Sequence, residues 1–358
     1  MSILDRYIVK EFVKIFILSL LGLIVVYLAI DFLGNIKNFI EHDAGLFDAL
    51  EYFLLKLPKV ISLISPPALL IAIRITFGIF SGNNEIVAME GSGISVYRIS
   101  MPLLLFSMLY TSLLLYLNLT AIPTANGEAE FIKDVLIENK PKGAYFRQDR
   151  IWFRGNDHSI FNIQLIDKNN RIRGINVYRV DDKFSIYEIV EAKELSYEKN
   201  GWVLISGVSR RFHEDGGIET LPFETLPINL DWRPDEISKI DIDPDNTTYS
   251  SLSSYVERLE SGGYSPGRYK VNLHEKISFP LVNFIMAMIG ISFGLRNSRG
   301  IGIAKSIGVS MVIGFNYWIV HSIAISLGYG GVIPPILAAW AGNLIFLAIG
   351  GYLFLTMR

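Results

Sequence analysis

Long apolar stretches lie toward both ends of this chain, and a more polar segment separates them. A bilayer core about 30 Å thick is crossed by about 20 apolar residues in a helix. Six stretches reach this length, and we predict a transmembrane helix in each: 15–34, 60–80, 99–121, 277–295, 306–327 and 333–356. The pair Pro66-Pro67 should kink or break the second helix, because proline cannot donate the helical hydrogen bond.

The segment between the third and fourth spans is composed of short β-prone runs. Clusters of Asn and Gly separate these runs at intervals of roughly ten residues. The runs, which are rich in Ile, Val, Tyr, Phe and Trp, are 144–154, 159–166, 172–180, 184–195 and 202–212. Such spacing is typical of a sandwich or a jelly roll.

A short amphipathic helix is expected after the β segment, because Leu252, Tyr255, Val256 and Leu259 recur at helical spacing. The predicted fold class is an α-helical polytopic membrane protein with six transmembrane helices and an inserted all-β, jellyroll-like domain between the third and the fourth. The predicted domains are 1–126 with the first three spans, 127–248 with the β domain, and 249–358 with the linker helix and the last three spans.

Composition supports a membrane protein and excludes several other classes. The chain is 51% hydrophobic, and most of its charged residues fall between Gly127 and Lys276. A net charge of −2 does not favour nucleic-acid binding, which requires a basic surface. The absence of Cys excludes disulfides and Cys nucleophiles, and the five His residues lack the spacing of a metal site. No small-residue cleavage site follows the first apolar stretch, so we expect no cleavable signal peptide.

Basic residues predict the orientation, because short cytoplasmic loops carry an excess of Lys and Arg. With an even number of spans, both termini share one side with the second–third and fourth–fifth loops. The basic residues on that side are Arg6, Lys10, Lys14, Arg98, Arg296, Arg299, Lys305 and Arg358. We therefore expect both termini in the cytoplasm and the β domain on the opposite side, in the periplasm.

No motif for nucleotide binding is present. The nearest match to a phosphate-binding loop, from Gly300 to Ser306, lacks the G-x-x-x-x-G-K spacing. The zinc-protease motif H-E-x-x-H is absent as well. We therefore expect neither an enzyme nor a bound cofactor, and transport against a gradient would require an ion gradient or a partner ATPase.

Few ionisable residues lie within the predicted spans, where such residues are functional candidates. Arg74 lies near the cytoplasmic end of the second span, and we expect it to snorkel to the interface. Asp31 lies near the outer end of the first span and is expected to be hydrated, and His321 lies toward the outer end of the fifth. The absence of a mid-depth acidic residue argues against an ion-coupled transporter.

The loop at 81–100 is expected to hold a short helix at about 84–91, with Asn at its start and Gly at its end. This helix would present Ile86, Val87 and Met89 as an apolar patch, which indicates a docking surface. Alternatively, the patch lies on the membrane, and Glu85 only interacts favourably with the helix dipole. Composition does not decide between these two interpretations.

Three ordered stretches of this chain resemble the LptF/LptG (YjgP/YjgQ) permease family, in particular its LptG branch. They are Leu4-Asp5-Arg6-Tyr7-Ile8, the loop from Asn84 to Ser95, and the discontinuous stretch from Ile242 to Leu281 that includes Asp245, Gly267 and Pro280. The order of three spans, β domain and three spans extends the resemblance over the whole chain.

The resemblance implies a heterodimer with an LptF-like subunit, whose twelve helices enclose a cavity open to the outer leaflet of the inner membrane. An LptB-like ATPase dimer would bind below. Lipopolysaccharide would enter between span one of one subunit and span five of the other, where the helix of an LptC-like protein often inserts. It would then pass to a periplasmic bridge of jellyroll domains that leads toward the outer membrane.

The resemblance also implies site residues. The ATPase-coupling helix would contain Glu85, Ile86, Val87, Met89 and Glu90, with Glu85 at the acidic position that contacts the ATPase. The substrate path would include Asp31, Phe32, Ile36, Lys37, Phe315, Trp318, Ile319 and His321. Lys37 matches a basic position that serves phosphate contacts, but Asp31 and Asn38 stand where relatives can carry Lys, which puts the strength of charge recognition in doubt.

Two other functions remain open from the sequence. The chain is alternatively an ABC permease for another envelope lipid or lipoprotein, or a non-transporting envelope scaffold. Co-purification with an ATPase separates the scaffold from the transporters, and the identity of the bound lipid separates the transporters from each other.

Overall fold

The structure of this chain is a computed structural model. It describes residues 3–42, 45–138, 145–147, 150–154, 159–166, 172–181, 185–198, 201–213, 217–228, 230, 243–261, 265–296 and 303–357. Most of the Asn and Gly clusters between the predicted strands lie outside these ranges, as do Ile242, Arg299, Gly300 and Arg358.

The chain divides into two compact units, which are described separately. The first comprises Met1–Glu138 and Gly267–Arg358, and the second comprises Asn139–Pro266. The boundary between the units after Glu138 falls later in the sequence than the boundary expected at 127. The reason is that helix α5 (Ala121–Phe131) and the π-helical segment η1 (Ile132–Ile137) belong to the first unit, where both pack on α2.

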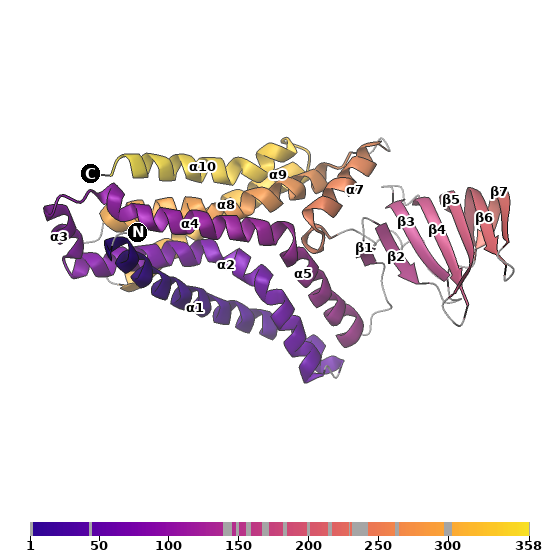
Figure 1. Cartoon of the computed structure of the whole chain (residues 1–358), viewed down its shortest axis with the longest axis horizontal. Helices are drawn as coiled ribbons and strands as arrows, with labels where there is room; N and C mark the ends of the chain where they lie inside the picture. Colours follow the sequence, from indigo (N-terminus) through magenta and orange to yellow (C-terminus); the bar gives the residue numbers. More distant parts are fainter. Residues whose placement is uncertain are drawn as a thin grey trace. The chain divides into compact units, whose positions relative to one another are not determined.

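Six helices among the described residues are long and apolar enough to cross a membrane, and each coincides with a predicted span. They are α1 (Ile3–Glu41), α2 (Leu46–Gly82), α4 (Val96–Leu119), α8 (Gly267–Arg296), α9 (Ile303–Tyr329) and α10 (Pro335–Leu355). Both termini and the short helix α3 (Glu85–Gly91) lie at one end of this unit, here called the terminal end (Figure 1). The opposite end, near α5, is called the α5 end.

Helix α2 continues without a break through Pro58, Pro66 and Pro67. Its course bends instead (Figure 1), so the proline pair kinks the span rather than ending it. An α-helix rises about 1.5 Å per residue, so the 39 residues of α1 and the 37 residues of α2 extend about 58 Å and about 55 Å. Both helices therefore exceed the thickness of a bilayer core, and their α5 ends pack together with α5 and η1 around Phe39 and Tyr52.

The helices α2 and α8 form the centre of the first unit. In their most apolar stretches, 72% and 67% of the residues are buried, against 11% in α1 and 28% in α9. A Cβ atom at Gly294 of α8 would lie 2.9 Å from the Phe77 ring of α2, so glycine permits this close contact. The residues from Gly290 to Gly294 match G-x-S-x-G, but Ser292 Oγ donates to the carbonyl of Met288 inside α8, which is the packing of a helix and not a nucleophile turn.

The second unit contains one antiparallel sheet of seven described strands in consecutive order. They are β1 (Tyr145–Arg147), β2 (Arg150–Arg154), β3 (Ser159–Ile166), β4 (Ile172–Val180), β5 (Ile186–Glu198), β6 (Gly201–Phe212) and β7 (Ile218–Ile228). The all-β prediction is confirmed. The described strand order is that of a meander (Figure 1), because each strand pairs with the next, and it differs from the Greek-key order of a typical jelly roll.

The core of the β unit lies on alternating positions of neighbouring strands. Phe161 pairs with Val177 and Val177 with Val190, and all three side chains are buried. The short 3-10 helix η2 (Pro244–Asn246) and the helix α7 (Tyr249–Ser261) follow the sheet, and the apolar stripe predicted from Leu252 to Leu259 is buried.

One carboxylate is buried in this sheet and fully engaged. Glu188 of β5 is 3% exposed, and its Oε1 accepts hydrogen bonds from Ser209 Oγ at 2.7 Å and Arg211 Nε at 3.0 Å. Its Oε2 lies 2.7 Å from Arg179 Nη1. Burial acts to raise the pKa of Glu188, but these hydrogen bonds and the arginine charges outweigh it and hold the pKa below its ordinary value.

Candidate functional site

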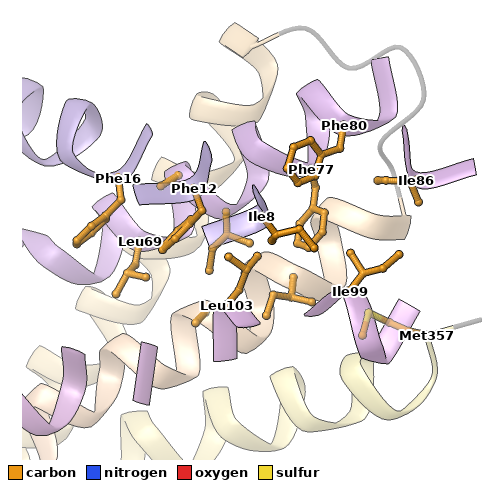
Figure 2. Packing of buried hydrophobic residues seen from close by; sticks show 14 of the residues in the cluster. Ile8, Phe12, Phe16, Leu69, Phe77, Phe80, Ile86, Ile99, Leu103 and Met357 are labelled. Atoms are coloured by element: carbon orange, nitrogen blue, oxygen red, sulfur yellow. The ribbon is translucent and has the colours of Figure 1, made fainter. Parts of the chain in front are cut away.

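The short helix α3 is fastened to the terminal end of the bundle. Ile86 and Met89 are buried in one hydrophobic cluster with Ile8 of α1, Phe80 of α2 and Ile99 of α4 (Figure 2). The prediction that Ile86 and Met89 form an uncovered patch is therefore wrong, because α1, α2 and α4 of the same chain cover them.

The other face of α3 is open within this chain. Val87 is 46% exposed, and Ala88, Glu90 and Gly91 are also exposed. Any docking surface on α3 is therefore smaller than predicted. It consists of the Val87 side chain beside the carboxylates of Glu85 and Glu90.

Glu85 is hydrogen-bonded within the chain. Its Oε2 accepts a bond of 2.9 Å from the Tyr7 hydroxyl of α1, and its Oε1 accepts one of 3.0 Å from Asn83 Nδ2. Asn84 precedes α3 with a φ of 60° and its side chain does not cap the helix, so the cap at Asn84 is formed by backbone alone.

Polar contacts of Arg98 and Tyr97 connect further helices at the terminal end. Arg98 at the start of α4 lies 2.6 Å from the carboxylate of Asp5 on α1. The hydroxyl of Tyr97 lies 3.2 Å from the carbonyl oxygens of both Leu355 and Met357. The helices α1, α3, α4 and α10 are thus joined at this end by polar contacts as well as by apolar packing.

Helix α1 is held near its two ends and exposed between them. Its buried side chains are Asp5, Ile8, Phe12, Phe16, Ile24 and Phe39. Among the predicted substrate-path residues on α1, Phe32 is 43% exposed and Ile36 is half-buried. The Lys37 side chain is 79% exposed and its Nζ lies 3.6 Å from Glu41.

Asp31 forms an ion pair that the sequence analysis did not predict. Lys56 Nζ of α2 donates to Asp31 Oδ1 at 2.8 Å, to Asp31 Oδ2 at 2.9 Å and to the Tyr52 hydroxyl at 2.6 Å. The side chains of Asp31 and Lys56 are only 16% and 17% exposed, so the expectation that Asp31 is simply hydrated is wrong. The useful signal in the sequence was that both charges lie at the same end of adjacent spans.

The predicted residues on α9 differ in their exposure. Phe315, Trp318 and Ile319 are exposed on one face, together with other large apolar side chains of α9. His321 lies one turn after Trp318 but is only 3% exposed: its Nε2 lies 2.9 Å from Glu275 Oε1 of α8, its ring stacks on Tyr317, and it meets the Trp318 ring edge-on. The structure therefore groups the three apolar residues and places His321 in the interior of the chain.

Arg74 does not snorkel within this chain. It is 4% exposed, and its Nε and Nη1 atoms have no hydrogen-bond partner among the described residues. The prediction of snorkelling is wrong, because neighbouring helices surround the side chain.

The candidate path residues form two separate surfaces. Helix α1 packs mainly on α2 and α4, whereas α9 packs on α10, α2 and α8. One chain thus carries an exposed apolar stripe on α1 and another on α9. These two helices have the smallest buried fractions among the six long helices.

Comparison with known proteins covers nearly the whole chain. The profile of the family described as "Lipopolysaccharide export system permease LptF/LptG" matches residues 6–356. The protein named lipopolysaccharide export system permease protein LptG of Escherichia coli K12 is 25% identical over 100% of this chain and 98% of its own length. The protein of the same name from Haemophilus influenzae is 23% identical over 99% of each.

Proposed function

Because this chain belongs to the LptF/LptG family of lipopolysaccharide export permeases, we propose that it is the LptG-like half of an ABC transporter's membrane channel. Paired with an LptF-like subunit, it extracts lipopolysaccharide from the outer leaflet of the inner membrane and passes it to a periplasmic β bridge. The observation that carries this proposal is the pair of apolar stripes on α1 and α9, the two least buried of the six long helices.

Two separate stripes on one chain suit a pseudo-symmetric dimer. Span one of this chain would face span five of the partner, and span five of this chain would face the partner's span one. Each junction would then be lined by large apolar groups such as Phe32 on one side and Trp318 on the other. Acyl chains have the same chemistry as these side chains, so such a junction can accept lipid without desolvating polar groups.

The terminal end is the proposed cytoplasmic end. Its basic residues Arg6, Lys10, Lys14 and Arg98 lie at the starts of α1 and α4, as expected for the cytoplasmic side of an inner-membrane protein. An LptB-like ATPase dimer would dock there on the exposed face of α3, with Val87 and Glu90 as its contacts and Glu85 at the edge of the surface.

The decisive experiment is photo-crosslinking in cells that contain the complete transporter. A crosslinking residue at Phe32 or Trp318 should capture lipopolysaccharide, whereas one at Leu344, an exposed apolar residue of α10, should capture phospholipid. Lys37→Glu should reduce capture of lipopolysaccharide, because it reverses an exposed charge near the path. Capture of only phospholipid at both path positions would leave an envelope permease with another cargo, and absence of a co-purifying ATPase would indicate a scaffold.

A further inference from the structure

Near the α5 end, the contact between α1 and α2 combines an ion pair, Asp31–Lys56, with aromatic packing of Phe39 on Tyr52. From Phe16 to Phe39, the only buried side chain of α1 is Ile24. Asp31 lies within this loosely packed stretch, where Lys56 holds it through both carboxylate oxygens. The ion pair therefore joins the outer half of α1 to α2 beside the ring contacts of Phe32 and Phe39.

The pair lies at the depth where lipid headgroups meet the hydrocarbon core. On α1, Asp31 directly follows a run, 15–30, that contains no charged residue. On α2, Lys56 lies just before the apolar stretch predicted at 60–80. A lysine at this depth is within reach of the bilayer surface.

The hydrogen bonds of Lys56 are saturated. An ammonium group has three donors, and Lys56 has three acceptors in two carboxylate oxygens and the Tyr52 hydroxyl at 2.6 Å. Tyr52 and Lys56 lie one turn apart on α2, so they stay together if α1 moves. Asp31 leaves with α1, and the Lys56 ammonium, whose side chain is 17% exposed in the pair, is then open to another anion.

We propose that Asp31, Lys56 and Tyr52 form an exchangeable latch. When α1 separates from α2, Lys56 and Tyr52 bind a phosphate of an anionic lipid headgroup in place of the Asp31 carboxylate. Phosphate and carboxylate oxygens are both anionic acceptors for an ammonium group, so the exchange keeps the charge neutralised. The proposal rests on the proposed function, and it makes α2 rather than α1 the helix that supplies this cation.

The test is a binding titration of the assembled transporter in nanodiscs, followed by native mass spectrometry. The probes are lipopolysaccharide with its lipid A phosphates and the same lipid after enzymatic dephosphorylation. Asp31→Asn should tighten binding of the phosphorylated lipid by about fivefold, the effect of one unneutralised lysine near an anionic group. Lys56→Gln should weaken binding by a similar factor. Lys14→Gln breaks an exposed ion pair with Glu11 at the other end of α1 and should change neither affinity.

The two single variants should change the affinity in opposite directions, which distinguishes an exchangeable latch from an ion pair that only stabilises the fold. The double variant Asp31→Asn/Lys56→Gln should behave like Lys56→Gln, and neither single variant should alter binding of the dephosphorylated lipid. If both single variants weaken binding equally, or if Asp31→Asn tightens binding of both probes alike, the latch is refuted while the proposed function stands. If the wild-type transporter binds neither probe, the proposed function fails, and the latch fails with it.

Discussion

The carboxylate of Glu85 can be tested as an ATPase contact separately from its role inside the chain. Glu85→Ala removes the proposed docking charge and the internal bonds from Tyr7 and Asn83, whereas Tyr7→Phe removes only the first of these bonds and Asn83→Ala only the second. Because Tyr7 is 40% exposed, solvent weakens the bond from Tyr7 below the usual range for a hydrogen bond to a charged group, to about 1 kcal/mol.

If Glu85 also pairs with a basic group of the ATPase in a desolvated groove, loss of this pair should cost about 2–5 kcal/mol more of binding free energy. The affinity of the membrane complex for the ATPase should then fall roughly 30-fold or more in Glu85→Ala. Tyr7→Phe should change it by about fivefold at most. The assay is equilibrium binding of the purified ATPase to the membrane complex in nanodiscs, with lipid export per ATP as a second readout. Equal effects of the two variants would refute a docking role and leave Glu85 as an internal brace.

Three further predictions concern the orientation of the chain, ATP hydrolysis and the buried Glu188. A Cys introduced at Tyr187 should react with a membrane-impermeant reagent from the periplasm and a Cys at Glu90 should not, and since the chain has no native Cys the labelling is unambiguous; the reverse pattern would overturn the orientation. The purified chain alone should hydrolyse no ATP, because it has no phosphate-binding loop, and turnover that survives rigorous purification would contradict this. Glu188→Gln should destabilise the β unit by about 2 kcal/mol, measured as faster hydrogen exchange in β5 and β6. Because the folded pKa of Glu188 is lowered below its ordinary value, its contribution is present above that ordinary value and is lost as the pH falls through the folded pKa. An unchanged protection factor of the wild-type amides across this acid range, after correction for intrinsic exchange, would count against the assignment.

Long periodic features of this fold were predictable from the sequence, because they depend on composition over many residues. Each of the six spans was found, and β3 and β4 were predicted with the observed bounds. Strand β7 was missed because Pro222 and Pro227 lower strand propensity. Both prolines are tolerated because β7 is at the edge of the described sheet and pairs only with β6.

The functional surfaces were harder to predict, because their exposure depends on partners distant in the sequence. Ile86 and Met89 are covered by residues such as Ile8, which no local pattern around α3 reveals. Asp31 meets Lys56 only because α1 and α2 form a hairpin that brings their charged ends together. In contrast, the predicted path residues Phe315, Trp318 and Ile319 lie together on an exposed part of α9, because their spacing follows the helical repeat, and their role stays a prediction.

The length of α1 gives it a mechanical property. Its 39 residues span about 58 Å, and Ile8, Phe12 and Phe16 anchor it in the cluster that also holds α3 (Figure 2). Beyond this anchor, from Phe16 to Glu41, the helix extends about 38 Å, so a turn of about 10° at the anchor would move the far tip by about 7 Å once the contacts of Asp31 and Phe39 are released. A small rotation at the terminal end would therefore become a larger displacement at the α5 end of the same helix.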